Sequence, residues 1–189
     1  MTLSMDKPYN KNSYGEGIYV NLVTVIKAED ISGQTLTFLN NPVDIGIKLT
    51  IDVGKEFTPE MFIFGNFEYD MLTGDIIGWG SAFVVQEVFK KLGVQGHLTK
   101  DNTIPESALA QLVGKQFYRL SYVSGAKDNG QLKYSDWNII ASLVEGAAFL
   151  ASKFQKSLTR GYPKNYKPQL LNRQNGYDDD KQNAIYDIF

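Results

Sequence analysis

Alternating apolar and polar residues predict β-strands in the first third of the chain. Over residues 44–53, apolar side chains occupy every odd position and polar or small ones every even position, the period of a strand with one buried face. The run over 61–68 follows a turn that contains Gly54 and Pro59 and also reads as a strand, with both of its faces apolar at one end. A β-branched run over 16–31 precedes both. We therefore expect three successive strands.

The pattern changes to a helical period in the middle of the chain and again after residue 142. Apolar residues recur at helical spacing within 78–93, where Ser81 is expected to cap a helix and Gly93 to end it. A short helix over 105–113 begins with proline and is followed by glycine. A last helix is expected over 143–158.

Two further strands, over 115–124 and 132–142, are expected on either side of the turn sequence GAKDNG. Three strands, a helical insertion, two strands and a C-terminal helix make the element order of the OB-fold, a five-stranded Greek-key barrel. We therefore predict a mainly β domain of this class. An unrelated α+β sheet or a jelly roll would give the same order and stays open as an alternative.

Composition narrows the chemistry. The 189 residues fit one domain with some length left for a tail. The sequence has no Cys and one His, so disulfides, thiolate sites and a multi-histidine zinc site are excluded. A Ser-His-Asp triad would have to use His97. Phosphate-loop, dinucleotide-binding and nucleophile-elbow motifs are missing. We expect a protein that is not an enzyme and has no cofactor or metal; a nuclease-like carboxylate cluster at Glu68, Asp70 and Asp75 is the weaker reading, since a turn explains it.

The charge of −2 is unevenly distributed. Residues 178–189 hold four Asp and one Lys, whereas residues 160–177 hold Arg160, Lys164, Lys167 and Arg173 and no acid. A basic, Pro- and Asn-rich stretch that leads to an acidic end is typical of a linker and tail. We therefore predict an OB-fold domain over 1–160, followed by a basic linker and acidic tail over 161–189.

Apolar runs of the length of a signal peptide or a membrane span do not occur in the sequence. The expectation is a cytoplasmic protein without a membrane partner.

One segment and the chain end resemble a known family. The run over 112–140, with Gly114, Lys115, Gly130, Tyr134 and Trp137, resembles the closing hairpin of phage-encoded OB-fold single-stranded-DNA-binding proteins. Bacterial and phage members of this class end in an acidic segment with a final Phe, and this chain is similar. Ile188 stands where the bacterial tip has Pro, which suits a phage-type tail better. The matching tail residues are Asp178, Asp179, Asp180, Asp187, Ile188 and Phe189.

The resemblance implies a protein that coats single-stranded DNA during viral replication, recombination or repair, in the host cytoplasm. It also implies that the tail recruits partners such as a DNA polymerase or helicase; a tail that only aids solubility is the plainer alternative. A virion structural or assembly protein that uses the barrel as an interaction module is the alternative function. Whether copies of the chain associate stays open.

Binding single strands without reading sequence needs aromatic faces for bases and cations for phosphates. Aromatic residues make up 13% of the chain. Strand alternation leaves several of them opposite the apolar faces, where core filling is the competing reading. Tyr118, Tyr122 and Trp137 are expected in the core, and Trp79 stays open. The candidate DNA-binding residues are Lys27, Lys48, Phe62, Phe64, Lys115, Phe117, Arg119, Lys133 and Tyr134.

Overall fold

The computed structural model describes residues 12–37, 39–95 and 102–172 of the chain. Its main sheet is antiparallel, with the strand order β4-β3-β2-β7-β8 and a short β1 beside β2. The strands are β1 (Asn12–Ser13), β2 (Ile18–Asp30), β3 (Ile45–Asp52), β4 (Glu60–Gly65), β7 (Gln116–Ala126) and β8 (Leu132–Asp136).

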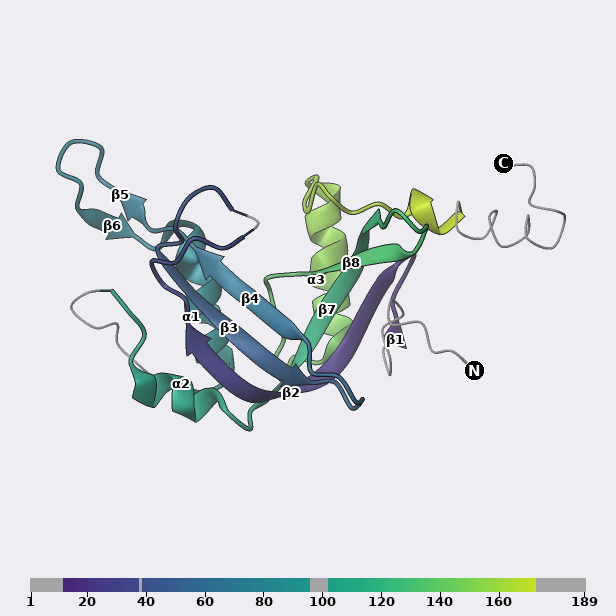
Figure 1. The fold of residues 1–189 in the computed structure, drawn as a ribbon, viewed down its shortest axis with the longest axis horizontal. Helices are drawn as coiled ribbons and strands as arrows, with labels where there is room; N and C mark the ends of the chain where they lie inside the picture. The colour runs from purple at the N-terminus through teal and green to yellow at the C-terminus, as the bar shows by residue number, and fades with distance from the viewer. Residues whose placement is uncertain (1–11, 38, 96–101, 173–189) are drawn as a thin grey trace, which may run out of the picture.

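The five longer strands form a nearly closed barrel. Their order is that of an OB-fold, in which the first strand pairs with both the second and the fourth. The barrel stays open between β4 and β8, the two ends of the strand order (Figure 1). This confirms the predicted mainly β fold of OB type with added helices.

Within the described residues, helices α1, α2 and α3 and a short 3-10 turn accompany the sheet, and residues 169–172 are also helical. The expected cap at Ser81 is wrong: Ser81 lies inside the 3-10 turn, and its Oγ accepts a hydrogen bond from the backbone N–H of Asn66 at 2.9 Å. Gly93 does follow the helix, with a φ of +69° that favours glycine. The elements are η1 (Gly80–Ala82), α1 (Phe83–Lys91), α2 (Glu106–Leu112) and α3 (Ala147–Thr159).

Two apolar cores hold the sheet. The larger core joins one face of β3 and β4 to α1, α2 and the middle of β2. The smaller core joins the other face of β2 and β7 to α3, around Phe154. Strand β2 serves both cores, because Ile18 and Val20 point to α3 whereas Val23 and Val25 point to the larger core.

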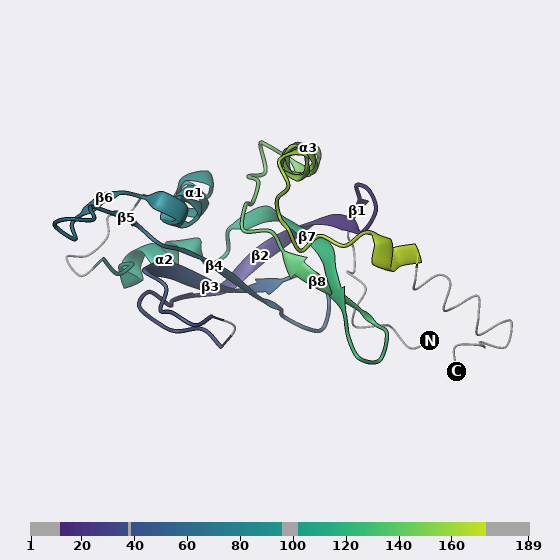
Figure 2. The same ribbon diagram turned by 90° about the horizontal axis from the view of Figure 1, so that it is seen from above.

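A bulge and strong twist make this arrangement possible. The β2–β3 register shifts between Val25 and Lys27, and bulges increase the local twist of a strand. Helix α1 covers the odd-numbered side chains of β3 and β4, whereas α3 covers the even-numbered side chains of β2 and β7. Both helices nevertheless lie on the same side of the molecule (Figure 2). Among the described residues, α1 and α3 therefore cover one side of the sheet, and the other side has no helix over it.

Lys91 links the two helix-covered parts. Its Nζ donates to the Ile140 carbonyl at 2.7 Å and lies 3.4 Å from the carboxylate of Glu145. The loop before α3 is thereby tied to the end of α1.

Packing continues beyond the expected domain boundary at Arg160. The Tyr122 hydroxyl donates to Asn165 Oδ1 at 2.8 Å, the Lys167 N–H donates to the Val123 carbonyl at 3.0 Å, and Tyr166 packs against the smaller core. Burial, which is only partly offset by the hydrogen bond to Asn165, raises the pKa of Tyr122. The basic segment thus lies against the barrel as far as residue 171 rather than acting only as a linker.

A second, two-stranded sheet was not predicted. Strands β5 (Glu68–Tyr69) and β6 (Ile76–Gly78) form a hairpin that projects from the end of the molecule near α1 (Figure 1). Within the described residues, none of the helices is long and apolar enough to cross a membrane.

Candidate nucleic-acid interface

The β3–β4 pair carries the first group of candidate residues. Lys48 lies opposite Phe62 and Gly46 opposite Phe64, on the face away from the larger core. On the other face, Ile47 and Ile63 are fully buried. The alternation that predicted outward Phe62, Phe64 and Lys48 is therefore confirmed.

Gly46 makes room for this aromatic pair. A Cβ built at Gly46 would lie 2.8 Å from the Cβ of Phe64 and 3.0 Å from Ile31, closer than side chains pack. Both rings are half-buried and rest against a small apolar cluster of Ile31, Leu36 and Val43. Phe62 and Phe64 therefore pack partly as core side chains, as the alternative interpretation predicted, and are partly exposed.

Cations and carboxylates alternate beside these rings. Glu29 accepts from Lys48 at 3.1 Å and from Lys27 at 3.2 Å, and Lys48 lies 3.8 Å from Glu60. The hydrogen bonds from Lys48 and Lys27 lower the pKa of Glu29, and the hydrogen bond to Glu29 raises the pKa of Lys48. Two lysines and two glutamates leave this face without net charge, so phosphate must displace carboxylate to bind here.

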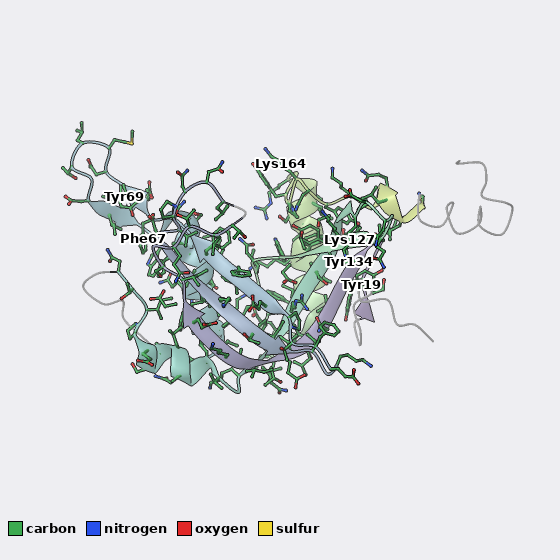
Figure 3. All side chains as sticks on the ribbon, viewed as in Figure 1. Tyr19, Phe67, Tyr69, Lys127, Tyr134 and Lys164 are labelled. Carbon is green, nitrogen blue, oxygen red and sulfur yellow. The ribbon has the colours of Figure 1, made fainter. Side chains whose placement is uncertain are left out.

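A second group lies on the β2–β7–β8 part of the sheet. The rings of Tyr19 and Tyr134 meet edge to face, with centroids 5.7 Å apart (Figure 3). Arg119 Nε donates to Asp136 Oδ1 at 2.6 Å, and both side chains are largely buried. Lys127 lies on the same β7–β8 hairpin (Figure 3).

Asn21 lies next to this group, and its side chain is buried without a hydrogen-bond partner among the described residues. It lies directly opposite Arg119 in the register, is 3% exposed, and has neither amide atom in a hydrogen bond. Burying an unpaired amide costs stability. A buried polar side chain without a partner is uncommon in folded proteins and is worth examining for a function.

The two groups share the helix-free side of the molecule. Helix α1 covers the face opposite Phe62 and Phe64, and α3 covers the face opposite Tyr19 and Tyr134. Since both helices lie on one side (Figure 2), the two uncovered faces lie together on the other. From the alternation along the strands alone, the group around Phe62 and the group around Tyr134 would be expected on opposite faces of the sheet.

The remaining candidate residues fall outside this surface. Phe117 is fully buried in the larger core opposite Val23, which corrects its assignment to the interface. Lys115 is exposed at the start of β7, where its carbonyl accepts the Val25 N–H at 2.9 Å, next to the end of α2. Lys133 is exposed on the β7–β8 hairpin beside Tyr134.

The residues expected in the core are found there, and the tail residues are outside the described part of the chain. Tyr122 and Trp137 are buried in the smaller core, as expected, and Tyr118 packs against it. Trp79 is half-buried against the larger core. The tail residues from Asp178 to Phe189 lie outside the described residues.

Sequence reasoning missed Tyr19, Asn21 and the acidic partners Glu29, Glu60 and Asp136. A signal for Tyr19 exists, because it alternates with Ile18 and Val20 and so points away from their core. Each ion pair depends on which strands become neighbours, and single-strand alternation carries no such information.

Among the described residues, groups of three or more His, Cys, Asp or Glu side chains placed to hold a metal ion are absent, so Glu68, Asp70 and Asp75 do not form such a cluster. The class that the fold defines is an OB-type barrel with aromatic and cationic side chains on its helix-free side. A scan against protein-family models and a search of curated proteins found no match for the chain.

Proposed function

We propose that the protein binds single-stranded DNA along the helix-free side of its barrel and coats exposed strands in viral replication, recombination or repair. The observation that carries the proposal is the placement of Phe62 and Phe64 beside Lys48 on the outer face of β3–β4. The second and third barrel strands of OB-folds are the usual ligand-binding strands. The protein acts here by binding, without a reaction of its own.

The chemistry of this face suits sequence-independent binding. Half-exposed rings offer π-faces on which any base can stack, and Lys27 and Lys48 offer cations to the backbone. Because the side chains of Lys27, Lys48 and Glu29 are 64%, 25% and 35% exposed, solvent and salt reach and weaken these ion pairs. Phosphate can therefore replace the carboxylate as the lysines' partner.

The β2–β7–β8 group extends the same surface. Tyr134 and Tyr19 add aromatic edges, and Arg119 adds a cation that Asp136 holds in place until a phosphate competes for it. The acidic segment 178–189 completes the proposal: it competes with DNA for these cations and, when released, recruits a polymerase or helicase.

Substitution by leucine tests the stacking faces. Leucine keeps the apolar packing of Phe62 and Phe64 on Ile31 and Leu36 but removes the π-face, so each of the two changes should weaken oligo-dT binding by about 1–3 kcal/mol. Fluorescence anisotropy of labelled oligo-dT measures the loss.

Phe149→Leu is the matched control, because Phe149 is 43% exposed on α3, on the helix-covered side. It should leave affinity unchanged. Equal losses in all variants, or unchanged affinity in Phe62→Leu and Phe64→Leu with native circular dichroism, would contradict this placement of the interface. Absence of oligo-dT binding in the unaltered protein would leave the virion-assembly alternative.

A further inference from the structure

The tip of the β5–β6 hairpin is a rigid, self-contained loop. The Asp70 carboxylate accepts the N–H groups of Leu72 and Thr73 at 2.8 and 2.9 Å. The Gly74 N–H donates to the Asp70 carbonyl at 2.9 Å, and the Asp70 N–H donates to the Asp75 carbonyl at 2.8 Å. The loop is therefore ordered before any partner arrives, which lowers the entropy cost of binding.

This loop presents apolar side chains to solvent. Met71 is 98% exposed, Leu72 95% and Ile77 60% (Figure 3 shows the hairpin with Tyr69 at its base). Neighbouring apolar side chains that are held out so fully are unusual unless another surface covers them. Met71 and Leu72 are almost fully exposed among the described residues of the chain, so they are available to another molecule.

Charge indicates the chemistry of that partner. The hairpin carries Glu68, Asp70 and Asp75, and the sequence has no Lys or Arg between residues 56 and 89. An acidic, cation-free projection repels the phosphates of nucleic acid. The hairpin is therefore suited to an apolar protein pocket with a basic group at its mouth.

The same end of the molecule contains such a pocket. A cavity of about 480 Å³ opens between α1, α2 and the start of β3. Its polar lining consists of three exposed side chains, those of Gln86, Lys90 and Gln95. Asn21, whose buried amide is unpaired among the described residues, does not line this pocket. The pocket therefore lacks the buried polar groups that orient a small ligand. Its apolar walls include Ile45, Trp79, Val85, Phe89, Val94 and Ile104.

We propose that this pocket receives the β5–β6 hairpin of a second copy of the chain, in a reciprocal dimer. Trp79 directly follows the hairpin and also lines the pocket, so the hairpin and the pocket are adjacent. The hairpin projects from the end of the molecule near α1 (Figure 1). A two-fold axis at this end brings each tip to the other copy's pocket, forming the contact twice. Asp75 of each hairpin then meets Lys90 of the other copy.

The proposal stands independently of DNA binding, because neither surface belongs to the candidate interface. Lys90 is accessible for the contact: its side chain is 77% exposed, and its ion pair with Glu87, at 4.0 Å, is long and exposed enough to be exchanged. Leu72 and Met71 supply the apolar area that fills the cavity.

Light scattering of the full chain over a concentration series tests the dimer. The unaltered protein should approach twice the mass of one chain as its concentration rises, and Leu72→Asp should stay monomeric. Val144→Asp is the matched control, because Val144 is 97% exposed in the loop before α3 and should leave the dimer intact. A monomer at every concentration, or a Leu72→Asp variant that still dimerises, overturns the proposal.

Charge reversal tests the pairing itself. Asp75→Lys and Lys90→Glu should each weaken the dimer at least severalfold, and the double variant should recover it. Both side chains are exposed, so folding should be unaffected. A double variant no better than the single ones overturns the assigned contact.

Trp79 gives a local readout. In a Trp137→Phe background, Trp79 is the remaining tryptophan, and its emission should shift to shorter wavelength as the dimer covers the pocket. Dimerisation without any change in Trp79 emission would place the contact elsewhere.

Discussion

Single residues decide which predicted side chains can meet a ligand. Phe117 belongs to an alternating strand like Phe62, yet it is fully buried, because it lies opposite Val23 of β2 on the face that joins the larger core. Sequence alternation predicted the correct outward face for Phe62 and Phe64, because Met61 and Ile63 on the other face are the ones that pack in the larger core. It could not do so for β7, where both faces are covered in part by apolar groups.

Asn21 is the residue whose environment the sequence hides most completely. In the printed sequence it is a polar residue between Val20 and Leu22, which predicts exposure. The structure buries it opposite Arg119, a neighbour from a distant strand that is itself largely buried and paired with Asp136.

Replacing Asn21 by leucine should therefore stabilise the fold. The change removes two unpaired buried polar atoms at similar side-chain volume, and we expect a gain of about 1 kcal/mol in the free energy of unfolding. For a chain of this size that corresponds to a rise in Tm of about 2–4 °C, measured by calorimetry. Asn40→Leu, at an exposed loop position, is the control and should not raise Tm. A lower Tm for Asn21→Leu would show that the amide is stabilising.

At the scale of elements, the periodic segments and the short helix over 105–113, which occurs as α2, were predicted well, whereas the β5–β6 hairpin was missed. The strands expected over 44–53 and 61–68 occur as β3 and β4, because one face of each packs on the larger core. The β5–β6 hairpin was not predicted, since its strands have two and three residues and no alternation to detect. What orders it is local: the hydrogen bonds that the Asp70 carboxylate accepts.

The hairpin loop should respond to pH through Asp70. The hydrogen bonds from the Thr73 and Leu72 backbone N–H groups lower the pKa of Asp70. A depressed pKa means that these bonds stabilise the loop above the ordinary Asp pKa and are lost as the pH falls through the lowered value. The amide NMR shifts of Leu72 and Thr73 should titrate together below the usual Asp range.

A variant separates this effect from general acid unfolding. Asp70→Ala should speed hydrogen exchange at Leu72 and Thr73 at neutral pH, whereas Asp70→Asn, which keeps an acceptor oxygen, should restore much of the protection. Unchanged exchange in Asp70→Ala would show that the carboxylate does not order the loop.

At the scale of the whole molecule, the interface depends on how the sheet twists. The long strand β2 joins the β3–β4 part to the β7–β8 part, and its bulge at Val25 and Lys27 lets faces of opposite parity share one side (Figure 2). The sequence predicted the strand order of the barrel. It could not predict this shared side, because twist and bulge depend on the register between strands distant in the chain.

The distribution of charge over the whole molecule explains why the formal charge of −2 does not argue against binding of nucleic acid. Four of the acidic residues lie in segment 178–189, and on the helix-free side Glu29, Glu60 and Asp136 are paired with Lys27, Lys48 and Arg119. Phosphate binding is then an exchange of anionic partners, and such an exchange must be sensitive to salt.

A salt titration of oligo-dT binding by the full chain tests the central claim most directly. If single-stranded DNA binds through these cations, the logarithm of the binding constant falls linearly with the logarithm of salt concentration, with a slope of about −0.7 for each phosphate contacted. Anisotropy of labelled oligo-dT measures it. No binding at low salt, or binding that salt does not weaken, would contradict the account.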